Sequence, residues 1–215
     1  MLNWMVHCWG IVPLTDMLSM VISKEIAEED TPENRAMLAE LFQMEQYVTM
    51  ALSYARLGNP TKDLVLTRVP LDPVIRQAIR DFAPLLIRKK LRLQYEPTAE
   101  SALTDSKWLL FILHQLLSNA VKYTDRGHVS IRVTSAPAII VADTGIGIAP
   151  EDVPRVFEKG YTGYNGRGGQ KSTGLGLYLV HQTAEMLHCR VSLSSRIGEG
   201  TSVTIDLHQE ELGKE

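Results

Sequence analysis

Two short glycine motifs constrain the fold of this 215-residue chain more than any other feature. The first motif is Asp143-Thr144-Gly145-Ile146-Gly147-Ile148 and the second is Ser172-Thr173-Gly174-Leu175-Gly176-Leu177. Upstream of both lies the asparagine-bearing segment His114-Gln115-Leu116-Leu117-Ser118-Asn119-Ala120-Val121-Lys122-Tyr123. Short glycine motifs occur by chance in many chains. In this order and spacing, however, the three segments predict a pocket for ATP that is neither a P-loop nor a Rossmann site.

The first motif begins with a carboxylate at a predicted strand end. Asp143 directly follows the apolar run Ala138–Ala142, which predicts a buried strand. A carboxylate at that place can accept a hydrogen bond from the exocyclic amine of adenine. Gly145 and Gly147 would let the backbone pass close to the base, and Ile148 completes the predicted set of contacts. The alternative is an ordinary turn, because Asp and Gly are common turn residues.

The asparagine segment belongs to a predicted amphipathic helix, since apolar residues recur at helical spacing from Trp108 to Val121. Four polar residues fall on one face of it: Gln115, Asn119, Lys122 and Tyr123. The amide oxygen of Asn119 is a predicted Mg²⁺ ligand beside a triphosphate, and Lys122 is predicted to meet phosphate charge. The alternative is a polar outer face on an ordinary helix.

The second motif opens another amphipathic pattern, residues 178–187. Backbone N–H groups at the positive end of a helix bind phosphates. Between the motifs, the segment 160–171 is dense in glycine and polar residues, which predicts a lid over ATP with Arg167 as a candidate phosphate contact. The other nucleotide contacts predicted here are Lys171, Ser172, Thr173, Gly174, Leu175, Gly176 and Leu177.

These motifs resemble those of the histidine kinases of two-component signalling, in the ATPase superfamily shared with gyrase, the Hsp90 chaperones and MutL. The asparagine segment resembles the family's N box, and the first and second glycine motifs resemble its G1 and G2 boxes. Val156-Phe157-Glu158-Lys159 is similar to its F box. Further segments resemble the intramembrane-sensing kinases that work with peptide-antibiotic ABC transporters in Gram-positive bacteria; they are Ser53–Leu57, Lys107–Leu109, Leu117–Tyr123, Pro154–Arg167 and Lys171–Leu179.

The resemblance, from about residue 40 to residue 207, implies an ATP-dependent protein-histidine kinase core. It implies that ATP and Mg²⁺ bind, that a His is phosphorylated, and that the phosphoryl group passes to an Asp of a response regulator. Hydrolases of this superfamily typically carry a Glu four residues before the metal-binding Asn, as general base. Here Gln115 stands there and Leu116 follows, which favours transfer to a protein. An ATP hydrolase of the same fold and a non-catalytic ATP-binding and dimerisation module remain alternatives.

The first sixty residues predict a helical hairpin, with a helix start at Thr31-Pro32-Glu33. The second helix carries an apolar stripe of Met37, Leu38, Leu41, Met44, Tyr47, Val48, Ala51 and Leu52. Two hairpins could bury these stripes as a four-helix bundle, so we expect a homodimer. The alternative is that the stripe packs on the same chain's α/β domain. The resemblance implies that residues 1–60 form a dimerisation and phosphoacceptor domain and residues 61–212 the catalytic domain.

The phosphoacceptor region departs from the family pattern. His7 is the candidate acceptor, but no carboxylate follows it, so the usual base for the imidazole is missing. Pro13 lies six residues after His7 instead of five, and counting back from Pro13 gives Cys8. Either the segment before Pro13 is non-native, through a shifted reading frame or an internal start, or the protein is a degenerate kinase.

Composition limits the partners. The net charge of −3 gives no case for nucleic acid, and we interpret Lys89, Lys90 and Arg92 as a solvated helix end. Cys8 and Cys189 show no metal spacing and suggest a reducing cytosol. No apolar run approaches the roughly eighteen residues of a membrane span. Because relatives carry two transmembrane helices upstream, we expect a soluble catalytic half on the cytoplasmic side of the bacterial membrane.

The predicted fold class is α+β, with a two-layer α/β sandwich after the hairpin. Leu57–Lys62 is the predicted linker, Leu71–Leu91 a helix interrupted near Pro84, and Gly198–Thr201 a hairpin turn. Helices are expected around 73–90, 105–122 and 174–188. The expected strands are Leu91–Tyr95, His128–Val133, Ala138–Ala142, Arg190–Ser195 and Ser202–Leu207.

Overall fold

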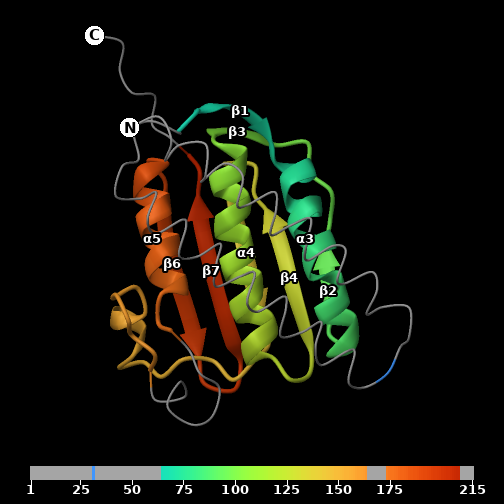
Figure 1. The fold of residues 1–215 in the computed structure, drawn as a ribbon, viewed down its shortest axis with the longest axis vertical. Helices are drawn as coiled ribbons and strands as arrows, with labels where there is room; N and C mark the ends of the chain where they lie inside the picture. The colour runs from blue at the N-terminus through green and yellow to red at the C-terminus, as the bar shows by residue number, and fades with distance from the viewer. Residues whose placement is uncertain (1–30, 32–63, 164–172, 209–215) are drawn as a thin grey trace, which may run out of the picture. The chain divides into compact units, whose positions relative to one another are not determined.

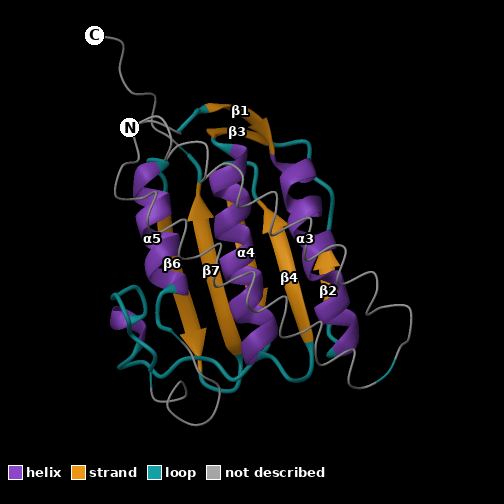
Figure 2. Ribbon diagram, in the orientation of Figure 1, coloured by secondary structure: helices purple, strands orange, loops and turns teal. Residues whose placement is uncertain are grey.

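A computed structural model describes residues 31, 64–163 and 173–208 of the chain. In this part, three α-helices cover one face of a five-stranded sheet (Figures 1 and 2). The predicted two-layer α/β sandwich is therefore confirmed. The predicted helical hairpin and the linker Leu57–Lys62 lie outside the described residues.

The main sheet has the strand order β2-β4-β5-β7-β6. Only the β2–β4 pair is parallel, and the other three pairs are antiparallel. The strands are β2 (Arg92–Tyr95), β4 (His128–Val133), β5 (Ala138–Asp143), β6 (Arg190–Arg196) and β7 (Gly200–Asp206). All five were expected from the sequence: the bounds of β4 are as predicted, and those of the other strands differ by at most two residues.

Strands β4 and β5 show why the sheet has one covered face. Val129 and Ile131 alternate with partly exposed or exposed residues in β4, and Ile139 and Val141 do so in β5. Since successive side chains of a strand point to opposite faces, the buried apolar side chains of each strand all point to the helices. The period-two pattern therefore fixes which face the helices cover.

The helices are α3 (Leu71–Arg88), α4 (Ser106–Tyr123) and α5 (Gly176–Met186). Helix α4 begins after Asp105, whose carboxylate accepts hydrogen bonds from the backbone N–H groups of Lys107 and Trp108, at 2.9 and 3.4 Å. The helices and strands share a core, whose largest fully buried side chains are Phe82, Leu71, Ile75, Leu109, Ile112, Leu113, Leu117, Ile131, Ile139, Leu179, Leu187 and Ile205. None of the helices in the described part is both long and apolar enough to span a bilayer.

Helix α3 corrects the expected interruption near Pro84, because it runs unbroken through that proline. Pro84 is exposed, while Ile75, Phe82 and Leu86 are buried on the opposite side. A proline inside a helix removes one backbone hydrogen bond and normally kinks or breaks the helix. Here the apolar stripe packed against α4 outweighs that loss.

Two short strands, β1 (Thr67–Pro70) and β3 (Ser101–Thr104), form a separate antiparallel pair that the sequence analysis missed. Each has only four residues, which is too short for a period-two pattern to stand out. The carboxylate of Asp105 also accepts the N–H of Val65 at 2.9 Å. The cap of α4 thereby ties this pair to the main core.

Candidate functional site

The carboxylate of Asp143 ends β5 and is held by backbone donors on two sides. The N–H of Gly145 donates to Oδ1 at 2.8 Å, and the N–H of Thr201, which lies opposite Asp143 on β7, donates to the same oxygen at 3.3 Å. Partial burial raises the pKa of the Asp143 carboxyl, and the two N–H groups act against that shift. The Asp143 carboxylate is therefore a hydrogen-bond acceptor with a fixed orientation in a partly buried position.

The loop that follows Asp143 is tied to three neighbouring elements. The Thr144 N–H donates to the His128 carbonyl at 3.2 Å, and the Ile146 N–H donates to the Tyr123 carbonyl at 3.2 Å. The carbonyl of Ile146 accepts from Gly198 at 2.9 Å, and the N–H of Ile148 donates to Ser195 Oγ at 2.8 Å. The loop thus has a fixed backbone path between the end of α4 and the β6–β7 hairpin.

The glycines of this loop are required by contacts within the protein. A Cβ on Gly145 would lie 2.3 Å from the Tyr123 carbonyl oxygen, and one on Gly147 would lie 2.0 Å from that of Arg196. Gly147 also has φ +70°, which side chains rarely adopt. This internal packing is a different reason for the glycines from the predicted close approach to a base.

The polar face of α4 meets the start of α5. Gln115 is only 4% exposed, and a Cβ on Gly176 would lie 3.3 Å from Gln115 Oε1 and 3.9 Å from Asn119 Oδ1. The amides therefore face the first residue of α5, so the alternative of an ordinary solvated helix face is wrong for Gln115. Asn119 lies one turn before Tyr123, whose carbonyl accepts the Ile146 N–H. Asn119 and the Asp143 loop consequently lie near the C-terminal end of α4, and this end of the helix is the lower one in Figure 1.

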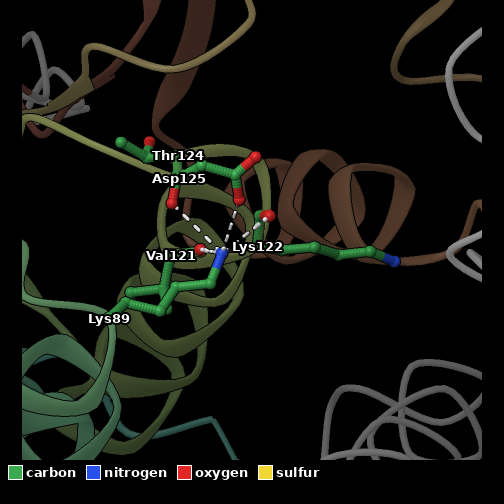
Figure 3. A network of polar contacts seen from close by, with 5 residues as sticks. All are labelled: Lys89, Val121, Lys122, Thr124 and Asp125. Atoms are coloured by element: carbon green, nitrogen blue, oxygen red, sulfur yellow. Dashed lines mark hydrogen bonds and ion pairs between the residues drawn. The ribbon is translucent and has the colours of Figure 1, made fainter.

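Lys122 and Tyr123 occupy the last turn of α4. Burial lowers the pKa of the Lys122 ammonium, whose Nζ lies 5.4 Å from the centre of the Tyr123 ring. Figure 3 shows the Lys122 side chain extending away from Lys89 and Asp125. This places a partly desolvated cation beside an aromatic ring at the end of α4.

Helix α5 begins at Gly176 after Leu175, an N-cap residue that offers no side-chain oxygen. Gly174 has φ +65°, and a Cβ on it would lie 2.4 Å from the backbone carbon of Gly160, whose N–H donates to the Gly174 carbonyl at 3.0 Å. Thr173 Oγ1 accepts the N–H of Leu175 at 3.4 Å. The positive end of α5 is thus set by backbone contact between the second motif and residue 160.

The segment that resembles the F box, Val156–Lys159, directly follows a short 3₁₀ helix, η2 (Val153–Arg155). Arg155 pairs with Glu158 at 3.0 Å and lies 4.3 Å from the centre of the Tyr161 ring. The Tyr161 hydroxyl donates to Asp152. These contacts hold residues 152–161 together, and Gly160 in this segment binds the second motif through Gly174.

Sequence reasoning missed Thr201 and Ser195. Ser195 Oγ donates to the Gly200 carbonyl and lies 2.9 Å from Thr201 Oγ1. Together with its bond from Ile148, this hydroxyl joins the Asp143 loop to the hairpin. The predicted turn at Gly198–Thr201 could have paired Thr201 with Ser195, but the pairing of Thr201 with Asp143 depends on β5 and β7 being neighbours in the sheet. Four candidate residues, His7, Arg167, Lys171 and Ser172, lie outside the described residues.

Comparison with known proteins identifies this domain. The family model described as "Histidine kinase-, DNA gyrase B-, and HSP90-like ATPase" matches residues 104–211, half of the chain. The sensor protein BceS of Halalkalibacterium halodurans is 38% identical over 162 residues, covering 74% of this chain and 48% of that protein. The sensor histidine kinase YxdK of Bacillus subtilis is 34% identical over 189 residues, covering 85% and 58%. The chain thus spans about half the length of these curated relatives.

Solved histidine kinases share the fold. The Acinetobacter baumannii histidine kinase AdeS superposes with a TM-score of 0.60 at 19% identity, covering 91% of this chain and 96% of that one. Full-length ShkA in complex with AMPPNP gives a TM-score of 0.61 at 22% identity, covering 91% and 44%. The family match and the sequence relatives therefore show that the chain belongs to the histidine kinase-, DNA gyrase B- and HSP90-like ATPase family and is homologous to sensor histidine kinases.

Proposed function

We propose that the described domain binds ATP with Mg²⁺ between α4, the Asp143 loop and the start of α5. The observation that carries the proposal is that Gln115 and Asn119 face Gly176, while one turn after Asn119 the end of α4 binds the loop that begins at the oriented carboxylate of Asp143. In this proposal Asp143 accepts a hydrogen bond from the adenine amine. The N-terminus of α5 and the Lys122 ammonium meet the phosphates.

The donor set fits Mg²⁺ held together with phosphates. Mg²⁺ prefers hard oxygen ligands and usually keeps several waters and phosphate oxygens in its shell. The amide oxygen of Asn119 would supply one such ligand, and a glycine at position 176 leaves free the space that a side chain would fill. The metal would neutralise charge on the transferred phosphoryl group.

The remaining candidate contacts complete the proposal. Tyr123, Gly145, Gly147 and Ile148 would line the base end, and the second motif would line the phosphate end with Lys171, Ser172, Thr173, Gly174, Leu175, Gly176 and Leu177. The glycines act mainly by allowing the backbone path described above. Their side of the site is therefore shaped by backbone groups.

The proposed reaction is transfer of the γ-phosphoryl group to a histidine of the helical region, with His7 as the candidate, and then to an Asp of a response regulator. Gln115 supports transfer over hydrolysis, because a buried amide cannot take a proton from water at neutral pH. Positioning and charge neutralisation would supply most of the catalysis. The names of the relatives support the same class of reaction.

The proposal extends to the whole protein by analogy with the relatives. Residues 1–60 would dimerise and carry the acceptor, and residues 61–212 would form the catalytic domain. By the same analogy, the protein would act at the bacterial membrane with a response regulator and a peptide-antibiotic ABC transporter. A second candidate, a non-catalytic ATP-binding and dimerisation module, is favoured by the departure of the His7 region from the family pattern.

One labelling experiment tests the proposed function. The full chain is incubated with γ-labelled ATP and Mg²⁺, with and without His7→Ala. Acid-labile label on the protein that disappears in His7→Ala supports the kinase with His7 as acceptor. Free phosphate without labelled protein indicates a hydrolase, and ATP binding with neither product indicates the module.

A further inference from the structure

The ammonium group of Lys89 is half-buried against the end of a neighbouring helix. Lys89 Nζ donates to the carbonyl of Val121 at 2.8 Å, of Thr124 at 3.1 Å and of Lys122 at 3.3 Å. It also lies 3.4 Å from Oδ1 of Asp125, whose side chain is 87% exposed (Figure 3). The sequence interpretation of Lys89 as part of a solvated helix end is therefore wrong.

Helix α4 needs these donors because it ends without a cap of its own. Its C-cap residue, Thr124, is extended, with φ −110° and ψ 115°, so the chain does not form the left-handed turn that commonly satisfies the last carbonyls. Lys89 takes three of the four carbonyls between residues 121 and 124. The fourth, that of Tyr123, accepts the N–H of Ile146 in the Asp143 loop.

The backbone of Lys89 is held in place by the end of α3. Lys89 is the C-cap of α3, and its N–H donates to the Leu85 carbonyl at 3.0 Å. The chain then turns at Lys90, with φ 54°, and the N–H of Leu91 returns to the Leu86 carbonyl at 2.9 Å. The ammonium group of Lys89, which is anchored at the end of α3, therefore lies at the negative C-terminal end of α4, where the helix dipole favours a cation.

We propose that Lys89 is a positioning residue for the nucleotide site, an inference that rests on the proposed function. By holding the carbonyls on either side of Tyr123, Lys89 fixes the last turn of α4, which carries Lys122 and Tyr123. Lys89 thereby also orients the Tyr123 carbonyl toward the N–H of Ile146, and so fixes the position of the Asp143 loop relative to α4. In this role Lys89 acts through the carbonyls at the end of α4.

The binding test compares Lys89→Met, which keeps the length of the side chain but removes the donors and charge, with Lys90→Met. Lys90 is exposed and adjacent, so its substitution removes the same charge as a matched control. We expect the affinity of the full chain for Mg²⁺–AMPPNP to fall about tenfold in Lys89→Met and to stay within about twofold in Lys90→Met. Lys89→Arg keeps a cation with several donors and is expected to restore most of the affinity.

A second readout does not depend on nucleotide. Amide hydrogen exchange, followed by NMR, compares Ile146, which donates to Tyr123, with Ile148, which donates to Ser195 Oγ. In Lys89→Met we expect exchange at Ile146 to accelerate about tenfold while Ile148 stays unchanged. A general loss of stability would accelerate both amides together.

The outcomes separate the two proposals. Faster exchange at Ile146 alone, with weaker AMPPNP binding rescued by Lys89→Arg, supports the positioning role. Equal changes at Ile146 and Ile148, or none at either, would overturn it. If the wild-type chain binds no AMPPNP, the proposed function fails, and the exchange measurement still decides whether Lys89 controls the Asp143 loop.

Discussion

The two glycine motifs border the same proposed site but are anchored in different ways. The Asp143–Ile148 loop exchanges hydrogen bonds with β4, the end of α4, β6 and the β6–β7 turn. In the described part of the second motif, Thr173–Leu177, the carbonyl of Gly174 accepts a hydrogen bond from the N–H of Gly160. The proposed adenine end of the site is thus held by hydrogen bonds from several elements of the domain, whereas the proposed phosphate end contacts the segment around Gly160.

This difference predicts where substitutions act. Glycine substitutions in the first loop should mainly lower the stability of the whole domain, because its backbone is held by β4, the end of α4 and the β6–β7 hairpin. Changes in the second motif should mainly lower nucleotide affinity, because they move the start of α5 with less effect on the core. Three substitutions test this division between stability and nucleotide affinity.

The largest effect is expected for Gly147→Ala. Its Cβ would lie 2.0 Å from the Arg196 carbonyl oxygen at a φ of +70°, so both a clash and backbone strain result. We expect the free energy of unfolding to fall by about 2–4 kcal/mol in chemical denaturation. The control is Gly198→Ala, with φ +77° and no atom within 4 Å, which should cost about 1 kcal/mol. Equal losses in the two variants would show that the close contact is unimportant.

A smaller effect is expected for Gly174→Ala. A Cβ there would lie 2.4 Å from the backbone carbon of Gly160. To relieve this clash the backbone at Gly174 must shift, and the start of α5, which follows directly, shifts with it. We expect about tenfold weaker binding of Mg²⁺–AMPPNP by titration calorimetry. The free energy of unfolding should change by less than in Gly147→Ala. A variant with normal affinity but poor stability would reverse the proposed division between the motifs.

The smallest effect is expected for the stability of Asp143→Asn without nucleotide. Because burial raises the folded-state pKa of Asp143 above its ordinary value, the charged carboxylate slightly destabilises the fold at neutral pH. That penalty disappears as the pH falls through the raised pKa and then the unfolded-state value of 3.8. Asp143→Asn should therefore unfold at the same or a slightly higher temperature than the wild type at pH 7. A clearly lower melting temperature would show that the charge stabilises the loop.

Much of this architecture could be predicted from the sequence. The alternation in β4 and β5, the apolar faces of the helices and the place of Asp143 at a strand end are local patterns, and the structure has them. Pro84 was misjudged because the packing of α3 against α4 is not local. Lys89 and Thr201 were missed as parts of the site because their partners, α4 and Asp143, are distant in sequence.

The most direct test of the central claim is calorimetric titration of AMPPNP, with and without Mg²⁺, into the wild-type chain, Asp143→Asn and Asn119→Ala. The account predicts that Asp143→Asn weakens binding in both conditions, because it alters the contact to the base. Asn119→Ala should remove only the gain in affinity that Mg²⁺ gives. Binding by both variants that equals the wild type in both conditions would contradict the assignment of Asp143 to adenine and of Asn119 to the metal.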